Sequence, residues 1–295
     1  MTLTDHELED FADRALRAAR RASTHIQTWV GEHREVNTKQ GSGSLASQVV
    51  TEVDIACQEL ILSELESTLT PNQIGLLTEE SEDDSSRLRS DYFWCIDPLD
   101  GTLPFIEGIP GYSVSVALVS REGNSVLGVV IDPRTGEEFK AVRGQGLQIN
   151  GNPFVTPSAH GTNSLHWMMN RSMKTHPRYT EIDSAMQTLA KRLGFQRIEE
   201  SSTSGGVLHA CRVLREGPAV YFTLPKTGTG GGSIWDYAAT ACFFEEAGIP
   251  VTTPRGDRLH LNHSETTFMS HCGVLYASSM ELRKAVEELC AGFLP

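Results

Sequence analysis

The spacing of apolar residues changes from a helical to an extended pattern near residue 74. Before that point, apolar residues recur at three- or four-residue steps over residues 8–26, which predicts a long amphipathic helix. A second helix is predicted from about residue 54 to residue 65, with Ile55, Leu60, Ile61 and Leu65 available for burial. Thr4 and Glu7 have the spacing of a capping box at the start of the first helix. A chain that switches period in this way is expected to pack helices against a sheet.

Short β-rich runs separated by turn residues follow this change and predict a sheet between residues 74 and 142. The runs are IGLL, YFWCID, SVSVALV, VLGVVID and EEFKAV. Helical and extended patterns then alternate along the rest of the chain. They predict helices at about 180–193, 206–215, 235–247 and 280–289, and strands at 197–201, 219–224 and 273–277.

Two stretches without periodicity are candidates for breaks in the chain. Residues 41–44 are rich in Gly and Ser and are expected to interrupt the chain before the second helix. Residues 157–163 are small and polar and predict a seam between two lobes. We therefore expect an N-terminal lobe of residues 1–158, with the first helices and the central sheet, and a C-terminal lobe of residues 159–295, with a second sheet.

The composition excludes several classes of partner. The formal net charge of −13 argues against a nucleic-acid polymer or a membrane surface, because both are bound by clustered Lys and Arg. Six cysteines lack the spacing of a zinc site or a disulfide framework and are expected to be reduced. No apolar run approaches the roughly 18 residues of a membrane span, and the N-terminus is acidic, so we expect a cytoplasmic protein.

The segment WCIDPLDGT at residues 94–102 places two carboxylates where they could bind metal ions. An apolar strand leads into Asp97 and Asp100, and Pro98 stiffens the turn between them. Gly101 allows the backbone to approach a ligand closely. Hard cations such as Mg²⁺ prefer oxygen ligands, and a divalent cation is the form in which an acidic protein can offer positive charge to a phosphate.

Acidic residues also end two other predicted elements. Glu79 and Glu80 follow the strand that begins at Ile74, and Asp236 follows Trp235 at the start of a helix. Each has a simpler explanation when taken alone, because acid pairs at strand ends are usually solvated and Asp often caps a helix. Three separate segments that offer carboxylates at element ends nevertheless favour one shared metal site.

Together these motifs resemble the inositol monophosphatase superfamily of metal-dependent, lithium-sensitive phosphatases. The resemblance covers residues 44–248 and implies an α+β fold of the sugar-phosphatase type, with layers in the order α-β-α-β-α. It also implies an enzyme that hydrolyses small soluble phosphate monoesters. It rests on LTEES at 77–81, on WCIDPLDGT at 94–102 followed by Phe105 and YSVSVA at 112–117, and on Trp235-Asp236 before Ala238-Ala239.

Carried over position by position, the resemblance implies two or three Mg²⁺ ions and inhibition by Li⁺. Thr102 matches the threonine that hydrogen-bonds the attacking water, Asp54 matches the acid that orients this threonine, and Glu79 would also position the water. The N–H groups of Gly101 and Thr102, at an expected helix N-terminus, would receive phosphate oxygens. The implied metal ligands are Glu79, Asp97, the backbone carbonyl of Leu99, Asp100 and Asp236.

Two branches of the superfamily compete as models for the substrate. One contains the inositol monophosphatases, and the other contains the 3'(2'),5'-bisphosphate nucleotidases that convert phosphoadenosine phosphate to AMP. Three features favour the nucleotidases: the acidic loop at 77–88, the segment NRS at 170–172, and Lys226 in a region where inositol-specific members carry an acid. A lysine there would suit a second phosphate group.

The predicted substrate pocket departs from both branches. SGG at 204–206 stands where a G-T-A or G-S-S loop is common, and Ala219-Val220 replaces Ala-Asp. Another sugar or polyol phosphatase of the same fold, and a non-catalytic phosphate-binding protein, are therefore alternatives. A homodimer is implied by the resemblance. The candidate substrate contacts are Gly101, Thr102, Ser204, Gly205, Lys226 and Asp236.

Overall fold

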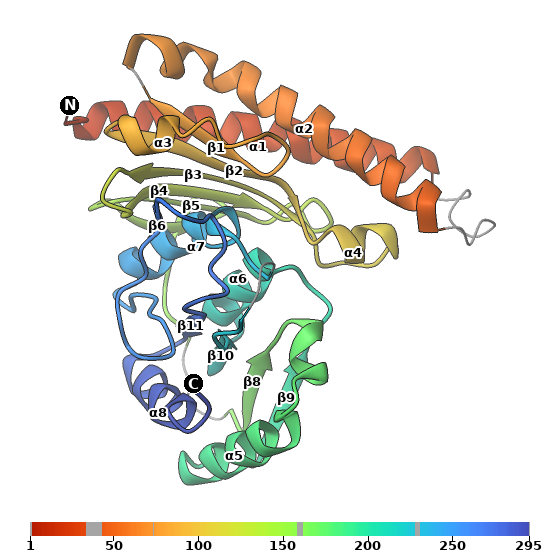
Figure 1. The fold of residues 1–295 in the computed structure, drawn as a ribbon, viewed down its shortest axis with the longest axis vertical. Helices are drawn as coiled ribbons and strands as arrows, with labels where there is room; N and C mark the ends of the chain where they lie inside the picture. The colour runs from red at the N-terminus through yellow and green to blue at the C-terminus, as the bar shows by residue number, and fades with distance from the viewer. Residues whose placement is uncertain (1, 34–42, 73, 158–161, 228–230, 295) are drawn as a thin grey trace.

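Five layers of helix and sheet stack in the order α-β-α-β-α, which confirms the expected fold class (Figure 1). The computed structural model describes residues 2–33, 43–72, 74–157, 162–227 and 231–294. The predicted seam falls largely on residues 158–161, which lie outside the described residues, so the lobe boundary stays a prediction.

Helices α1 (Asp5–His33) and α2 (Gly43–Asn72) form the first layer, and the predicted capping box begins α1. The Thr4 N–H donates to the Glu7 carboxylate at 2.8 Å, and the Glu7 N–H donates to the Thr4 hydroxyl at 3.3 Å. The predicted break before α2 is only partly testable. Residues 41–42 lie outside the described residues, and Gly43 and Ser44 already belong to the helix.

The buried face of α2 agrees with the prediction at Ile61 and Leu65 and differs from it at Ile55. Ile55, which was expected to be buried, is 42% exposed, and Leu60 is half-buried. The reason is the register of the helix, because the apolar side chains that meet the core recur at four-residue steps and place residue 55 on another face. Within residues 52–69 of α2, where the structure describes the side chains, the buried apolar stripe consists of Val53, Cys57, Ile61 and Leu65.

The second layer is a seven-stranded sheet in the sequential order β1 to β7. β1 runs parallel to β2, and every later neighbour is antiparallel. The five predicted runs are confirmed, whereas the two short strands β6 and β7 were not predicted. The strands are β1 (Gly75–Thr78), β2 (Tyr92–Asp100), β3 (Ser113–Ser120), β4 (Ser125–Ile131), β5 (Glu138–Val142), β6 (Gly146–Ile149) and β7 (Asn152–Pro153). Two short helices, α3 (Ser86–Arg89) and α4 (Thr102–Ile106), flank β2 along the chain.

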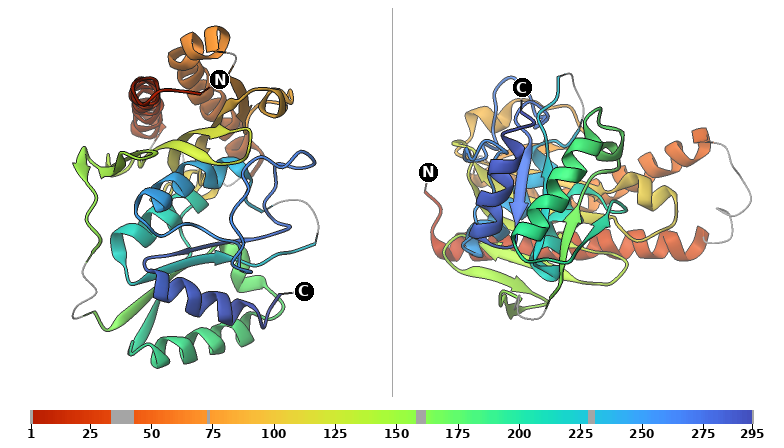
Figure 2. Two further views of the ribbon diagram at one scale, coloured as in Figure 1. Left: turned by 90° about the vertical axis from the view of Figure 1, so that its left-hand side faces the viewer. Right: turned by 90° about the horizontal axis from the view of Figure 1, so that it is seen from below.

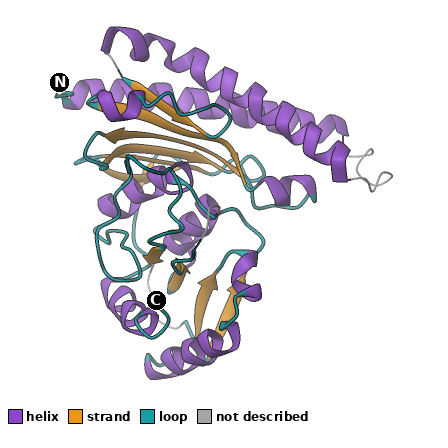
Figure 3. Ribbon diagram, viewed as in Figure 1, coloured by secondary structure: helices purple, strands orange, loops and turns teal. Residues whose placement is uncertain are grey.

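Helices α6 (Gly206–Glu216) and α7 (Ile234–Glu246) form the middle layer between the two sheets (Figure 3). α7 packs against β2 to β5 of the large sheet, and α6 packs against β8, β10 and β11 of the small one. The small sheet has the order β11-β10-β8-β9. Its strands are β8 (Ser164–Met168), β9 (Arg197–Ser201), β10 (Ala219–Thr223) and β11 (Val274–Ala277), of which β8 was not predicted.

The fifth layer consists of α5 (Tyr179–Arg192) and α8 (Met280–Cys290), which cover the outer face of the small sheet (Figure 2). A short 3-10 helix, η1 (Arg171–Thr175), links β8 to α5. All six cysteines are free, as expected, and five are buried. No helix in the described ranges is long and apolar enough to cross a membrane.

Apolar packing joins the two predicted lobes. One cluster of buried side chains contains Phe93 of the large sheet, Phe243 of α7, and Tyr221 and Tyr276 of the small sheet. The middle helices therefore bury apolar surface against both sheets at once, and this shared core fixes where α7 begins relative to β2.

Candidate metal centre

A β-bulge in β2 brings Asp97 and Asp100 to the same side of the sheet. Side chains three residues apart in a regular strand point to opposite faces. Here Asp97 pairs with Ser115 of β3 and Asp100 pairs with Ser113, so β2 has one residue more than its partner between the two pairs. Pro98, which has no N–H to offer the neighbouring strand, lies in this bulge. Both carboxylates are buried.

Asp236 approaches these two residues from the first turn of α7. The N–H of Ser233 donates to the Asp236 carboxylate and forms part of a capping box that begins the helix. Ser233 is the N-cap of this helix, and Asp236 occupies the N3 position of the box. One of its carboxylate oxygens lies within 4.8 Å of ligand oxygens of both Asp97 and Asp100.

The three carboxylates form a compact group of oxygen atoms. Within the described ranges, no other group of three or more His, Cys, Asp or Glu side chains brings its ligand atoms this close. Like charges at such distances repel each other unless protons or a cation neutralise them. Oxygen-only donors suit a hard divalent cation, so this group could hold a metal ion.

Glu79 joins this group through Asp97. Its N–H donates to the Ile96 carbonyl at 3.2 Å and continues the pairing of β1 with β2 by one residue. Its side chain hydrogen-bonds to Asp97. As a residue Glu79 is exposed, and it lies outside the group of three oxygens. The structure therefore brings together all four acids that the sequence predicted as ligands.

The pKa values of the four acids are all raised. Burial raises the pKa of Asp97 well above its usual range, and the other three carboxylates raise it further. Burial is also the main cause of the raised pKa of Asp100, Asp236 and Glu79. Among the described residues, the charged groups that act on these four are other carboxylates. A bound cation would favour the ionised acids and reverse these shifts.

The N-terminus of α6 fixes the Asp100 carboxylate. The Gly206 N–H donates to Oδ1 at 3.2 Å, and the Val207 N–H donates to Oδ2 at 3.1 Å. The Ser113 hydroxyl donates to Oδ2 at 3.4 Å. These three bonds oppose the effect of burial on the pKa of Asp100. Gly205 packs so closely that a β-carbon there would come within 2.3 Å of Oδ2, so a larger residue at this position would have to displace the Asp100 carboxylate.

The two predicted water-positioning residues lie on helices that pack together. Asp54 belongs to α2, and Thr102 is the first residue of α4. Asp54 is buried, and its Oδ1 has no hydrogen-bond partner among the described residues. Burial, followed by the charges of Glu80 and Glu79, raises the pKa of Asp54 to about 8. No hydrogen bond joins Thr102 to Asp54 in the described part of the chain, and their roles stay predictions.

Gly101 makes the turn from β2 into α4. Its φ of 87° lies in the left-handed region, which glycine adopts without strain. A β-carbon there would come within 2.5 Å of the Gly111 carbonyl oxygen. The predicted helix start at Thr102 is confirmed, and Thr102 is exposed. The contact of these two residues with phosphate stays a prediction.

Ser204 and Gly205 use their N–H groups inside the protein. The Gly205 N–H donates to the Gly111 carbonyl at 2.7 Å, and the Ser204 N–H donates to Nε2 of His209 at 3.3 Å. In this structure the segment supports Asp100 through Gly205. Its predicted contact with substrate stays a prediction.

Lys226 is exposed and lies in the loop after β10. It lines a pocket together with Asn170 and Ser172, the outer residues of the NRS segment, and with Tyr237. Because Tyr237 directly follows Asp236 in the first turn of α7, this pocket lies next to the group of carboxylates.

Arg171, the middle residue of the NRS segment, does not line that pocket. Its guanidinium pairs with both carboxylate oxygens of Glu107, at 2.7 and 2.5 Å. Glu107 ends α4, whereas Arg171 begins η1. The ion pair therefore links the helix that carries Thr102 to the C-terminal part of the chain.

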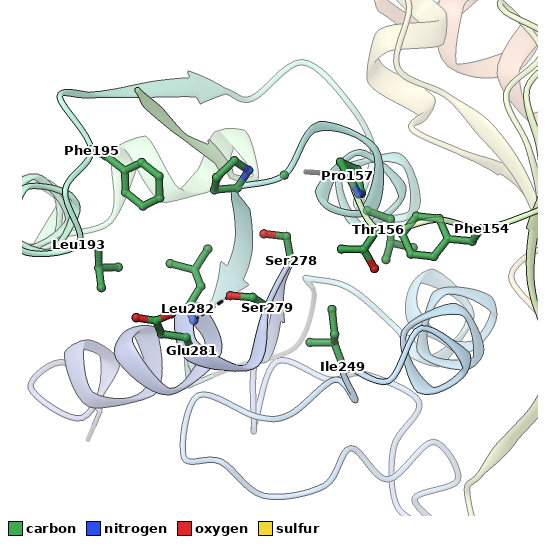
Figure 4. A pocket seen from close by; sticks show the side chains of 13 residues that line it. Phe154, Thr156, Pro157, Leu193, Phe195, Ile249, Ser278, Ser279, Glu281 and Leu282 are labelled. Atoms are coloured by element: carbon green, nitrogen blue, oxygen red, sulfur yellow. Dashed lines mark hydrogen bonds between the residues drawn. The ribbon is translucent and has the colours of Figure 1, made fainter. Parts of the chain in front are cut away.

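A separate pocket lies away from the acids and is lined mainly by apolar side chains (Figure 4). Phe195, Leu193 and Leu282 lie on one side of it, and Phe154 and Pro157 lie on the other. None of the predicted site residues lines this pocket. It offers no group of converging acids and is no candidate for the metal centre.

The groups that hold Asp100 were not predicted from the sequence. They are the hydroxyl of Ser113 and the N–H groups of Gly206 and Val207. A signal existed for the last two, because a helix was predicted to begin at residue 206 and the first N–H groups of a helix have no partner within it.

Comparison of the sequence with known proteins matches one protein family over nearly the whole chain. The model of the inositol monophosphatase family matches residues 7–291. Nus factor SuhB of Vibrio cholerae is 31% identical over 268 residues, which are 88% of this chain and 91% of that protein. Inositol monophosphatase 1 of Solanum lycopersicum is 27% identical over 285 residues, which are 95% of this chain and 97% of that protein.

Solved structures share the fold. SaIMPase-II from Staphylococcus aureus, solved with 2'AMP bound, superposes with a TM-score of 0.71. The match is 18% identical and covers 95% of this chain and 93% of that chain. At this identity the likeness shows the fold alone.

Proposed function

Because this chain belongs to the inositol monophosphatase family of phosphoric monoester hydrolases, we propose that it hydrolyses small phosphate monoesters with two or three Mg²⁺ ions. We further propose that its preferred substrate is a 3'(2'),5'-bisphosphate nucleotide, phosphoadenosine phosphate, which it converts to AMP. The observation that carries the proposal is the group of carboxylate oxygens from Asp97, Asp100 and Asp236, each within 4.8 Å of the others.

The chain supplies enough oxygen ligands for these ions. In this proposal the Leu99 carbonyl and the side chains of Glu79, Asp97, Asp100 and Asp236 hold them. When bound, Mg²⁺ supplies positive charge to the phosphate dianion and lowers the pKa of water. Because burial raises the pKa of all four acids, binding of cations would favour release of protons from this group. Li⁺ is expected to inhibit.

Residues beside the acids would position the water and the phosphate. Glu79 and the Thr102 hydroxyl would orient the attacking water, and Asp54 would accept a hydrogen bond from Thr102. The unpartnered, buried Oδ1 of Asp54 supports this role, because a buried acceptor without a partner is costly. The N–H groups of Gly101 and Thr102 would donate to phosphate oxygens at the start of α4.

The preference for a bisphosphate rests on the pocket next to the metal centre. Lys226 is an exposed cation that lines this pocket with Asn170 and Ser172. A second phosphate group would find its counter-charge there. SaIMPase-II has been solved with 2'AMP and with inositol monophosphate, so proteins of this fold bind both classes of ligand.

Inositol 1-phosphate is the second candidate substrate. The Solanum lycopersicum relative that matches almost the whole chain is named inositol monophosphatase 1. In that case Lys226 would play no part in binding, because inositol 1-phosphate carries a single phosphate group.

A direct comparison of the two substrates tests the proposal. Phosphate release is measured from phosphoadenosine phosphate and from inositol 1-phosphate with Mg²⁺, and then with Li⁺ added. We expect kcat/KM to be at least about tenfold higher for phosphoadenosine phosphate, which corresponds to 1.4 kcal/mol. The reverse preference would overturn the substrate proposal alone. No Mg²⁺-dependent release from either substrate or from a panel of sugar phosphates would overturn the proposed function.

A further inference from the structure

One side chain of α2 bridges both ends of the turn that carries Glu79. The Thr78 hydroxyl donates to Oε1 of Gln58 at 2.5 Å, and Nε2 of Gln58 donates to the Ser81 hydroxyl at 3.0 Å. Thr78 ends β1 directly before Glu79, and Ser81 follows Glu79 by two residues. A single amide thus contacts the chain on both sides of the acid.

Burial makes these two bonds costly to lose. Gln58 is 7% exposed and Thr78 is 3% exposed. A buried polar group that loses its hydrogen-bond partner pays the full cost of desolvation without compensation. Gln58 also follows Cys57, which belongs to the apolar stripe of α2, so this amide is a polar group at the edge of an apolar layer.

The two sides of this turn are attached to different elements of the fold. On the N-terminal side, the Glu79 N–H is tied to the Ile96 carbonyl of β2. Ser81 is exposed, and Gln58 supplies its hydrogen bond to the helix layer. Without Gln58, β1 would still bring Glu79 to the sheet edge, but the turn beyond Glu79 would lose its link to α2.

We propose that Gln58 is a positioning residue that holds the Glu79 carboxylate beside Asp97 and thereby sets the affinity of the metal centre. This inference rests on the proposed function, since it takes Glu79 as a metal ligand. Groups that orient metal ligands typically contribute 10–100-fold to metal affinity or activity. Gln58 touches neither metal nor substrate in this proposal and acts only through the turn.

The test compares Gln58→Met with Thr68→Val. Methionine keeps the volume of glutamine but forms neither hydrogen bond. Thr68 lies on the same helix and accepts the Trp94 Nε1–H at 2.8 Å, so Thr68→Val also removes a buried hydrogen bond of α2 but leaves the turn intact. Mn²⁺ binding by electron paramagnetic resonance, the Tm, and phosphate release at varied Mg²⁺ are measured for both variants.

We expect Gln58→Met to weaken Mn²⁺ binding at least about tenfold and to raise the half-saturating Mg²⁺ concentration equally, with kcat at saturating Mg²⁺ largely retained. Thr68→Val should lower the Tm and keep Mn²⁺ affinity within about twofold of the wild type. If Gln58→Met fails to fold, Ser81→Ala removes only the exposed end of the bridge and should weaken Mn²⁺ binding about threefold.

Three outcomes separate this inference from the proposed function. Unchanged Mn²⁺ affinity in Gln58→Met, or in Ser81→Ala where that variant replaces it, would overturn the role of Gln58. A wild type that binds Mn²⁺ but releases no phosphate would overturn the proposed function, while the loss of Mn²⁺ binding in the variant would still support Gln58. A wild type that binds no divalent cation would overturn both.

Discussion

The Asp100 carboxylate lies against Gly205, so closely that a β-carbon at residue 205 would come within 2.3 Å of Oδ2. The next two residues, Gly206 and Val207, donate their N–H groups to the same carboxylate. One short segment at the start of α6 therefore both makes room for a predicted metal ligand of β2 and holds it in place.

The first prediction follows from this close packing. Gly205→Ala should force the Asp100 carboxylate out of its bonds to α6 and weaken Mg²⁺ binding at least about tenfold. Isothermal titration calorimetry with Mg²⁺ measures the change in Kd. Gly31→Ala is the matched control, because a β-carbon on Gly31 of α1 meets nothing within 4 Å and should leave Mg²⁺ affinity unchanged. Equal affinities in both variants would contradict the prediction.

The second prediction concerns the charge on Asp97. Asp97→Asn should lower kcat at least about 10³-fold, the scale seen when a key electrostatic group is lost. The metal-free variant should also have a higher Tm than the wild type, because burial and three neighbouring carboxylates disfavour the charge at this position. Phosphate assays and thermal melts in EDTA measure both effects. Normal turnover would refute the role of Asp97.

The third prediction concerns metal removal. Mg²⁺ added to EDTA-treated protein should raise the Tm, because a ligand at 100 times its Kd stabilises the folded state by about 2.7 kcal/mol. In Asp236→Asn, which removes one of the three clustered charges, most of this increase should disappear. Sodium chloride at equal ionic strength is the control. A wild-type Tm that does not respond to Mg²⁺ would argue against a metal centre.

The fourth prediction is a pH dependence set by His209. This side chain is fully buried, and burial lowers the pKa of His209 to about 3. The unfolded chain takes up a proton near pH 6.5, whereas the folded protein does so only near pH 3, so stability is lost as the pH falls between these values. The loss contributed by this group is at most about 1.4 kcal/mol per pH unit.

Urea unfolding of the wild type and of His209→Gln at pH 7, 6 and 5 measures this contribution. The variant removes the titrating group, so the difference between the two proteins isolates it from the acids whose pKa values are raised. The free energy of unfolding of the wild type should fall more steeply with decreasing pH. Parallel pH dependences would show that His209 does not cause the loss.

The fifth prediction tests the proposed second phosphate site. Lys226→Gln should raise KM for phosphoadenosine phosphate about tenfold, the loss expected for one charge-assisted hydrogen bond. KM for inositol 1-phosphate should change less than about twofold, since that substrate has no second phosphate. Steady-state kinetics on both substrates measure the effect. If KM changed equally for the two substrates, Lys226 would not determine specificity.

Much of the fold could be predicted from the sequence because long periodic segments are strong signals. The strand predicted at 197–201 coincides with β9, and the predicted 280–289 helix differs from α8 by one residue. β6 and β7 have only four and two residues, too few to show a period. β8 is buried on both faces at most positions and lacks the alternation of a half-exposed strand.

The four acids could be predicted, but the way they meet could not. Their spacing alone places Asp97 and Asp100 on opposite faces of a strand, and only the bulge opposite β3 reverses this. Two of the three bonds that hold Asp100 come from residues more than 100 positions later in the chain. The bridge made by Gln58 likewise spans 20 positions to Thr78, and no local pattern marks such contacts.

Helix α7 covers the face of the large sheet formed by β2 to β5, yet it follows these strands only after the whole segment that contains α5 and α6. During synthesis on the ribosome, Phe93 and Phe139 therefore stay unprotected by α7 until residues 234–246 have been made. A nascent chain at that stage exposes apolar surface that is prone to aggregation, and it still lacks Asp236. A truncated mRNA that ends before the codons for α7 should accordingly produce a polypeptide that is bound by chaperones and degraded by proteases. We do not expect such a fragment to retain partial activity.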